Sequence, residues 1–173
     1  FNIPPAWLMI GGALLLPLFT GRSRNCFVLF LTALAFVWIV ALEPGSYLSV
    51  KFFGYDLTLL RVDKLSKLFG YIFTLYGFTA CLYAFYVRDI GQHLAALFYI
   101  GSALGVIFSG DLVSLYFYWE IMAVASVILV LSKGDKKSYG AGYRYVLVHI
   151  FGGLCLLLGI VLFIHNTGSV NFE

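Results

Sequence analysis

The chain has 173 residues, of which 62% are hydrophobic, 18% are aromatic and only 11% are charged. Soluble domains carry roughly 25% charged residues, so most of the surface of this protein cannot face water. The net charge of +3 comes without a basic stripe or an acidic patch, and this excludes a nucleic acid as a partner.

Six apolar segments approach the length of roughly 20 residues that a helix needs to cross a lipid bilayer. They cover residues 6–20, 26–42, 65–87, 94–110, 112–131 and 143–164. The first segment contains Pro17 and lacks the basic region and cleavage motif of a signal peptide, so we expect a retained helix. The sequence therefore predicts an all-α polytopic membrane protein, a single membrane domain over residues 1–173 with about six transmembrane helices.

The link between the second and third segments, residues 43–64, is too polar to span a bilayer. Apolar and polar residues alternate on both sides of Gly54-Tyr55-Asp56, which is typical of a short β-hairpin. We expect this hairpin-like link to lie outside the membrane, over one face of the helix bundle.

The basic residues predict the orientation of the helices, because cytoplasmic loops are enriched in Lys and Arg. The shorter loops carry Arg22, Arg24, Arg88, Lys133, Lys136, Lys137 and Arg144, and the long link on the opposite side carries Lys51, Arg61, Lys64 and Lys67. This distribution places the Lys133–Lys137 loop in the cytoplasm and both termini outside.

Glu120 is a carboxylate within an apolar segment, between Trp119 and Ile121. If the helix begins near Asp111, a rise of about 1.5 Å per residue puts Glu120 roughly 13 Å along it, close to the middle of a ~30 Å hydrocarbon core. An ionised carboxylate at that depth is costly, so it is either protonated or paired, and such residues often mark ion pathways. Proton translocation is the function that we expect; a neutral or salt-bridged packing residue is the alternative.

His149 is the second candidate, about 10 Å along the following helix if that helix begins near Gly142. The short loop between the last two segments makes them antiparallel neighbours, so His149 approaches the level of Glu120 from the other direction. Imidazoles exchange protons near neutral pH, which suits a proton carrier; a hydrogen bond to a backbone carbonyl is the equally weighted alternative.

Other polar groups surround these two residues in the sequence. Candidates for supporting hydrogen bonds are Tyr116, Ser126, Tyr145 and Arg144, although Arg144 lies near the membrane surface. Asp111 stands where a helix N-cap belongs, which we favour over ion binding. No paired carboxylates, nucleophile with its base, phosphate loop or metal-ligand spacing occurs, so the chain carries no catalytic chemistry and no cofactor of its own.

Three stretches resemble the antiporter-like subunits of multisubunit Mrp-type cation/proton antiporters, membrane-bound hydrogenases and respiratory complex I. Gly110-Asp-Leu-Val-Ser-Leu-Tyr-Phe-Tyr-Trp-Glu-Ile-Met-Ala-Val-Ala-Ser resembles their fifth helix, and the segment beginning Tyr143-Arg-Tyr-Val-Leu-Val-His-Ile-Phe-Gly-Gly resembles their sixth. Arg61-Val-Asp-Lys-Leu-Ser is similar to the motif before their third helix, so Asp63 and Asp111 fall in family motifs. The Ala-Ser after the glutamate is most similar to the D-type antiporter subunit.

The resemblance implies that Glu120 is the mid-membrane proton-carrying glutamate, which in this family pairs with a lysine on the seventh helix. It also implies other membrane subunits as partners, H⁺ and possibly Na⁺ as transported ions, and a prokaryotic plasma (inner) membrane. The chain ends after six segments, and no lysine lies in the middle of one of them, so the resemblance implies a fragment, a partly resolved subunit or half of a split subunit. A non-transporting membrane scaffold, or the proton-pump module of a redox-driven complex, are the alternatives.

Overall fold

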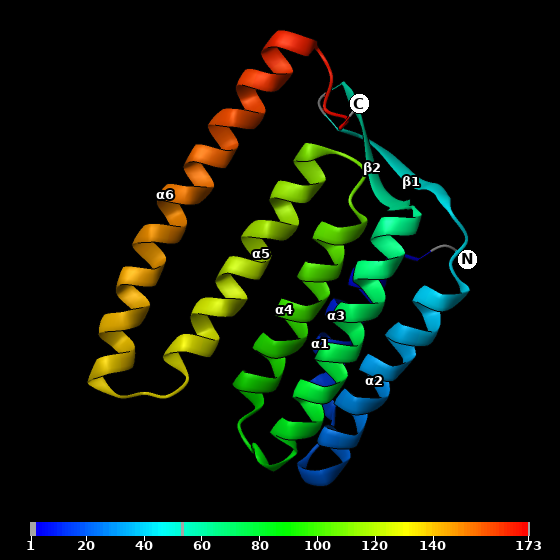
Figure 1. The fold of residues 1–173 in the computed structure, drawn as a ribbon. Coiled ribbons are helices and arrows are strands. Elements are labelled where there is room, and N and C mark those ends of the chain that lie inside the picture. The colour runs from blue at the N-terminus through cyan, green and yellow to red at the C-terminus, as the bar shows by residue number, and fades with distance from the viewer. Residues whose placement is uncertain (1–2, 53, 173) are drawn as a thin grey trace.

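A computed structural model of the protein describes residues 3–52 and 54–172 (Figure 1). In chain order the elements are α1 (Pro5–Leu15) with the 3-10 turn η1 (Leu16–Leu18), α2 (Gly21–Ala41), β1 (Gly45–Phe52), β2 (Tyr55–Val62), α3 (Lys64–Tyr83) with η2 (Ala84–Tyr86), α4 (Ile90–Phe108), α5 (Leu112–Leu131) and α6 (Lys136–Thr167). An all-α membrane architecture with about six helices and a hairpin between the second and third helices is therefore confirmed.

Within the described residues, five helices are long and apolar enough to cross a membrane, namely α2, α3 with η2, α4, α5 and α6. The remaining helix, α1 with η1, is a shorter apolar helix over Pro5–Leu18. At about 1.5 Å per residue it reaches roughly 20 Å, less than the ~30 Å thickness of a hydrocarbon core. The proline that the sequence places in this segment, Pro17, lies in the 3-10 turn that ends it.

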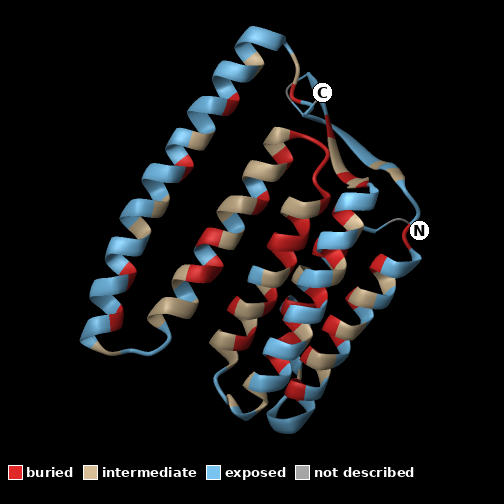
Figure 2. Cartoon of the chain, viewed as in Figure 1, coloured by how far each residue is buried: buried red, intermediate tan, exposed pale blue. Residues whose placement is uncertain are grey.

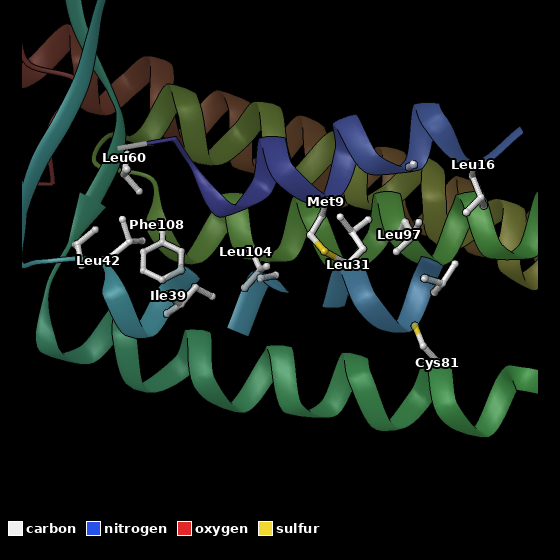
Figure 3. Packing of buried hydrophobic residues seen from close by; sticks show 14 residues of the cluster. Met9, Leu16, Leu31, Ile39, Leu42, Leu60, Cys81, Leu97, Leu104 and Phe108 are labelled. Atoms are coloured by element: carbon white, nitrogen blue, oxygen red, sulfur yellow. The ribbon is translucent and has the colours of Figure 1, made fainter. Parts of the chain in front are cut away.

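The buried core lies between α1, α2, α3 and α4, beneath the hairpin (Figures 2 and 3). Helix α4 is its centre, since 44% of the most apolar stretch of α4 is buried, whereas only 11% of the corresponding stretch of α6 is buried. Core side chains of α1, α2 and α4 interdigitate, and the fully buried examples are Met9, Leu16, Ile39, Leu97, Leu104 and Phe108. Helix α5 packs on α4, and α6 lies outermost, against α5 (Figure 1).

Close packing between α4 and α5 depends on Gly105. A β-carbon at this position would lie 2.3 Å from the ring of Tyr118 on α5, which no real side chain tolerates. The Tyr118 hydroxyl in turn accepts a hydrogen bond of 3.0 Å from Nε1 of Trp7 on α1. Small residues at helix contacts let backbones approach closely in a membrane, and here one glycine makes room for a tyrosine that joins α1, α4 and α5.

The β1–β2 hairpin covers one end of the bundle and is antiparallel, with Gly45 opposite Val62 and Phe52 opposite Tyr55. Within β2, Leu57, Leu60 and Val62 are buried, whereas β1 is largely exposed. Leu60 and Val62 follow the two-residue period of a ribbon with one covered face, whereas Leu57, three residues before Leu60, is buried on the other face.

Several helices begin earlier than the apolar segments predict. Helix α4 begins at Ile90 and α6 at Lys136, because Asp89 and Asp135 act as N-caps that accept hydrogen bonds from Gly91 N and Ser138 N. The added first turns are polar, so a search for apolar residues alone omits them.

Candidate functional site

Glu120 lies in the middle of α5, and its carboxylate is directed at α6. A β-carbon added at the buried Gly153 of α6 would lie 2.6 Å from Glu120 Oε1. The carboxylate therefore occupies the space that any other residue at position 153 would need. A tyrosine one turn earlier, Tyr116, has its phenol close enough to the Glu120 carboxylate to interact with it electrostatically.

The half-buried Glu120 also faces α4. It lines an apolar cavity of about 560 Å³ between α4 and α5, whose walls include Leu94, Phe98 and Val124. In the part of the chain that the structure describes, Glu120 forms no ion pair. No lysine or arginine of α5, or of the flanking helices α4 and α6, therefore pairs with the Glu120 carboxylate.

His149 lies on α6, where its ring stacks with two aromatic rings. The ring of Trp119 on α5 is 6.1 Å away at an interplanar angle of 17°, and that of Tyr145 on α6 is 5.7 Å away at 19°. The stack fixes the plane of the imidazole, and its buried Nε2 is left without a hydrogen-bond partner in the described chain.

A hydrogen bond between hydroxyl groups joins the same two helices one turn further along. Ser126 Oγ donates to the carbonyl of Ala123 at 2.6 Å and lies 2.8 Å from the Tyr145 hydroxyl. The serine hydroxyl has one proton, and it donates this proton to the Ala123 carbonyl. In the contact between the two hydroxyl groups Tyr145 is therefore the donor and Ser126 the acceptor.

These contacts set the relative heights of the residues along antiparallel α5 and α6. Ser126 lies opposite Tyr145 and Glu120 lies opposite Gly153, and His149 falls midway between Tyr145 and Gly153. At about 1.5 Å per residue, His149 is therefore within roughly 6 Å of the level of Glu120. The structure thus brings Glu120, Tyr116, His149, Tyr145 and Ser126 to one helix interface.

The other predicted site residues lie elsewhere. Arg144 is exposed on α6 and is not brought to Glu120. Asp111 is fully buried at the hairpin end of the bundle, where it caps α5 by accepting hydrogen bonds from Ser114 N at 2.7 Å and Ser114 Oγ at 2.8 Å. A third bond of 2.8 Å from Thr58 N ties β2 to the same carboxylate.

Asp63 caps α3 in a capping box, accepting a hydrogen bond from Ser66 N at 2.7 Å while Asp63 N donates to Ser66 Oγ at 2.8 Å. The backbone N–H of Ser66 is the main cause that lowers the pKa of Asp63, against a smaller opposing effect of burial. A lowered pKa means that this cap stabilises the fold above the pKa of the unfolded chain and loses that contribution as the pH falls through the folded value. Asp63 is thus a structural residue at the membrane surface, far in sequence from Glu120.

Two residues of the site, Gly153 and Trp119, were not singled out by the sequence. Gly153 is one of two adjacent glycines, and Trp119 is one of many aromatic residues near it. Their positions relative to the two candidate residues could have identified them. Trp119 directly precedes Glu120, and Gly153 follows His149 by four residues, which is about one helical turn. Among the described residues, no group of three or more His, Cys, Asp or Glu side chains could hold a metal ion.

Comparison with known sequences shows similarity to subunits of membrane antiporters. The family described as NADH:quinone oxidoreductase/Mrp antiporter, TM, matches residues 109–173. The A subunit of the Na(+)/H(+) antiporter of Alkalihalophilus pseudofirmus is 33% identical over 120 residues, which are 65% of this chain and 15% of that protein. The A1 subunit of the Na(+)/H(+) antiporter of Staphylococcus haemolyticus is 34% identical over 110 residues, 60% of this chain and 14% of that protein. The chain thus spans a small part of these relatives, and similarity to the D-type subunit stays a prediction.

Solved structures share the fold over nearly the whole chain. A chain of the membrane-bound sulfane sulfur reductase, an archaeal respiratory membrane complex, superimposes with a TM-score of 0.86 and 28% identity, over 98% of this chain and 28% of that one. A chain of respiratory complex I from Thermus thermophilus superimposes with a TM-score of 0.81 at 23% identity, over 97% of this chain and 37% of that one.

The match at residues 109–173 contains α5 and α6, the two helices that carry Glu120, His149 and Gly153. The chain is therefore similar to antiporter-like membrane subunits of the Mrp and complex I type, over a part of their length.

Proposed function

We propose that this chain is part of a proton-translocating subunit in which Glu120 binds and releases the transported proton. The observation that carries the proposal is the position of the carboxylate, which lies in the middle of a span, against a glycine and beside an apolar cavity. Ionisable residues within membrane spans are rare and mark ion and proton pathways, which suits this role.

His149 is the second proton carrier in this scheme. It lies within one turn of the level of Glu120, and its buried Nε2 has no hydrogen-bond partner in the described chain. The hydroxyl groups of Tyr145 and Ser126 continue from it towards the Lys133–Lys137 end of the bundle. A proton could pass between these groups with the help of water, because hydroxyl groups and imidazole both donate and accept hydrogen bonds.

The cation that discharges Glu120 comes from outside the described residues. The lysines of the described chain lie in the hairpin, in loops or in the first turns of α3 and α6, and none of them forms an ion pair with Glu120. We expect a buried lysine from a neighbouring segment or another chain of the complex. Exchange of the proton for Na⁺ is the finer form of the proposal, supported by the presence of Na(+)/H(+) antiporters among the relatives.

Replacement of Glu120 by Gln in the assembled complex tests the proposal, since Gln keeps the shape of the side chain and removes its charge. We expect proton flux across proteoliposomes to fall at least tenfold while assembly is retained, because loss of a group required for proton transfer typically costs 10²–10⁴-fold. Glu43→Gln, at an exposed loop position, is the matched control and should leave flux unchanged.

His149→Phe extends the experiment, because phenylalanine keeps the stack with Trp119 and Tyr145 but cannot carry a proton. We expect reduced flux with normal assembly. Unchanged flux in Glu120→Gln, in a complex that assembles normally, would instead favour the membrane scaffold.

A further inference from the structure

A pocket of about 700 Å³ lined by three arginines and an asparagine lies at the end of the bundle opposite the hairpin, where α2 begins and α3 ends (Figure 1, lower end). Its walls are Gly21, Arg22, Arg24 and Asn25 on α2 and Phe85, Tyr86, Val87 and Arg88 after α3. These residues lie at the limits of two membrane spans, Gly21–Ala41 and Lys64–Tyr86. The pocket is therefore at the depth of lipid headgroups, and the candidate translocation site does not use it.

Two polar side chains of this pocket are buried and incompletely bonded. Arg24 and Asn25 are each 9% exposed. Arg24 Nη2 donates to the carbonyl of Arg88, and Asn25 Nδ2 donates to the carbonyl of Phe85, so both side chains are held in place. Yet Arg24 Nε and Asn25 Oδ1 have no partner among the described residues. A buried donor and a buried acceptor without partners are costly, so a polar ligand that bonds to them would gain that cost back.

The charge of the pocket selects an anion. Three guanidinium groups line it, and the lining that the structure describes includes no carboxylate. Asp89, which follows Arg88, accepts a hydrogen bond from Gly91 N at 3.0 Å and so caps α4. Helix α2 also begins here without a side-chain cap from Thr20, which leaves its first backbone N–H groups available. Guanidinium groups and a helix N-terminus are both favourable partners for phosphate oxygens.

Two further features distinguish a phospholipid from free phosphate. The unpaired Asn25 Oδ1 needs a donor, which a headgroup hydroxyl supplies and a fully ionised phosphate does not. In addition, Val87 also lines an apolar groove of about 480 Å³ between α3 and α4, with Tyr76 and Ala80 among its walls. An acyl chain attached to a headgroup in the pocket would find an apolar path there.

We propose that Arg22, Arg24 and Arg88 bind the phosphodiester of an anionic phospholipid whose headgroup carries hydroxyl groups, of the phosphatidylglycerol class. One acyl chain lies along the α3–α4 groove. The site is at the same end of the bundle as the Lys133–Lys137 loop, and basic pockets between helices on that side of a membrane are suited to anionic headgroups.

Lipid binding by the full-length protein in nanodiscs tests the proposal, with native mass spectrometry as the measurement. The test variant is Arg22→Gln with Arg88→Gln, which removes two charges but keeps Arg24 and the backbone carbonyl that holds it. The control is Lys136→Gln with Lys137→Gln, an equal loss of charge at exposed residues of the same end. Since a hydrogen bond between a charged group and its partner contributes about tenfold or more, and the control residues make no such bond to the lipid, we expect the test variant to bind phosphatidylglycerol roughly a hundredfold more weakly.

The control variant should bind this lipid nearly as well as the unaltered protein, and phosphatidylcholine should not be retained by any of them. Glycerol 3-phosphate, which has the phosphate and the hydroxyl groups but no acyl chain, should fail to displace bound lipid at millimolar concentration. Equal losses in the two double variants would overturn the proposal, because they would reflect surface charge alone. Displacement by glycerol 3-phosphate would overturn it in favour of a soluble anion.

Discussion

The position of the Glu120 carboxylate depends on the missing side chain of Gly153. The carboxylate lies in the space that a side chain at position 153 of α6 would fill. Large apolar side chains surround Gly153 along α6. A longer side chain at position 153 would force the carboxylate towards the apolar cavity beside α4, away from the stacked imidazole of His149. The glycine therefore sets the position of the acid without taking part in any chemistry.

Gly153→Ala tests this dependence and Gly152→Ala is its matched control. A methyl group at 153 would lie 2.6 Å from Glu120 Oε1, whereas one at 152 would meet no atom within 4 Å. We expect Gly153→Ala to lower proton flux severalfold, because an acid displaced by about 1 Å loses much of its effectiveness, and Gly152→Ala to leave flux unaltered. Flux in proteoliposomes is the measurement, with equal assembly of both variants as the condition. Equal fluxes would show that the carboxylate is not held by this contact.

At the scale of the helix, hydropathy predicts the spans but not the whole helices. The apolar segments locate α2 to α6, and the alternation around Gly54 locates the hairpin. Polar first turns are missed, although the Asp135-to-Ser138 spacing of a capped helix start is visible in the sequence. Glu120 could be found because a charge in an apolar segment is conspicuous. Gly153 could not be singled out, because its role depends on how α5 and α6 align across a loop.

The two capping aspartates that match family motifs should differ in their contributions to stability. Asp63 is exposed and caps α3 alone, so we expect Asp63→Ala to cost about 0.5–2 kcal/mol, the usual range for an N-cap. Asp111 is fully buried and accepts three hydrogen bonds, including one from β2, so Asp111→Ala leaves buried donors unpaired. We expect a loss of about 3 kcal/mol or more.

Thermal unfolding of the purified full-length protein, followed by tryptophan fluorescence, measures both substitutions. The midpoint should fall more for Asp111→Ala than for Asp63→Ala. The reverse order would mean that the hairpin is held to α5 by its apolar contacts and not by the Asp111 carboxylate.

Over the whole molecule, the hairpin end and the opposite end of the bundle have different characters. At the hairpin end the chain is tied together over long sequence distances, since Gly110 N donates to Thr58 O at 2.8 Å and Leu112 N donates to Val170 O at 3.0 Å. Such pairings cannot be predicted from local pattern. The opposite end consists of short basic loops, with Arg88 after α3 and Lys133 after α5. Because the two ends differ in their basic residues, the fold can be inserted in one preferred orientation.

That orientation can be tested with single cysteines at the two ends of the bundle, in the full-length protein with Cys26, Cys81 and Cys155 replaced by Ala. Lys51→Cys lies on the exposed strand β1, and Lys133→Cys lies in the loop before α6, where the native side chain is 77% exposed. The excess of basic residues in the short loops predicts that this loop faces the cytoplasm. In intact cells, a membrane-impermeant maleimide should therefore label Lys51→Cys at once and Lys133→Cys only after permeabilisation. The opposite pattern would invert the orientation, and with it the side of the membrane on which the Arg22–Arg24–Arg88 pocket meets its lipid. Labelling of both cysteines in intact cells would contradict a single orientation, because only one end of a spanning bundle can face the outside.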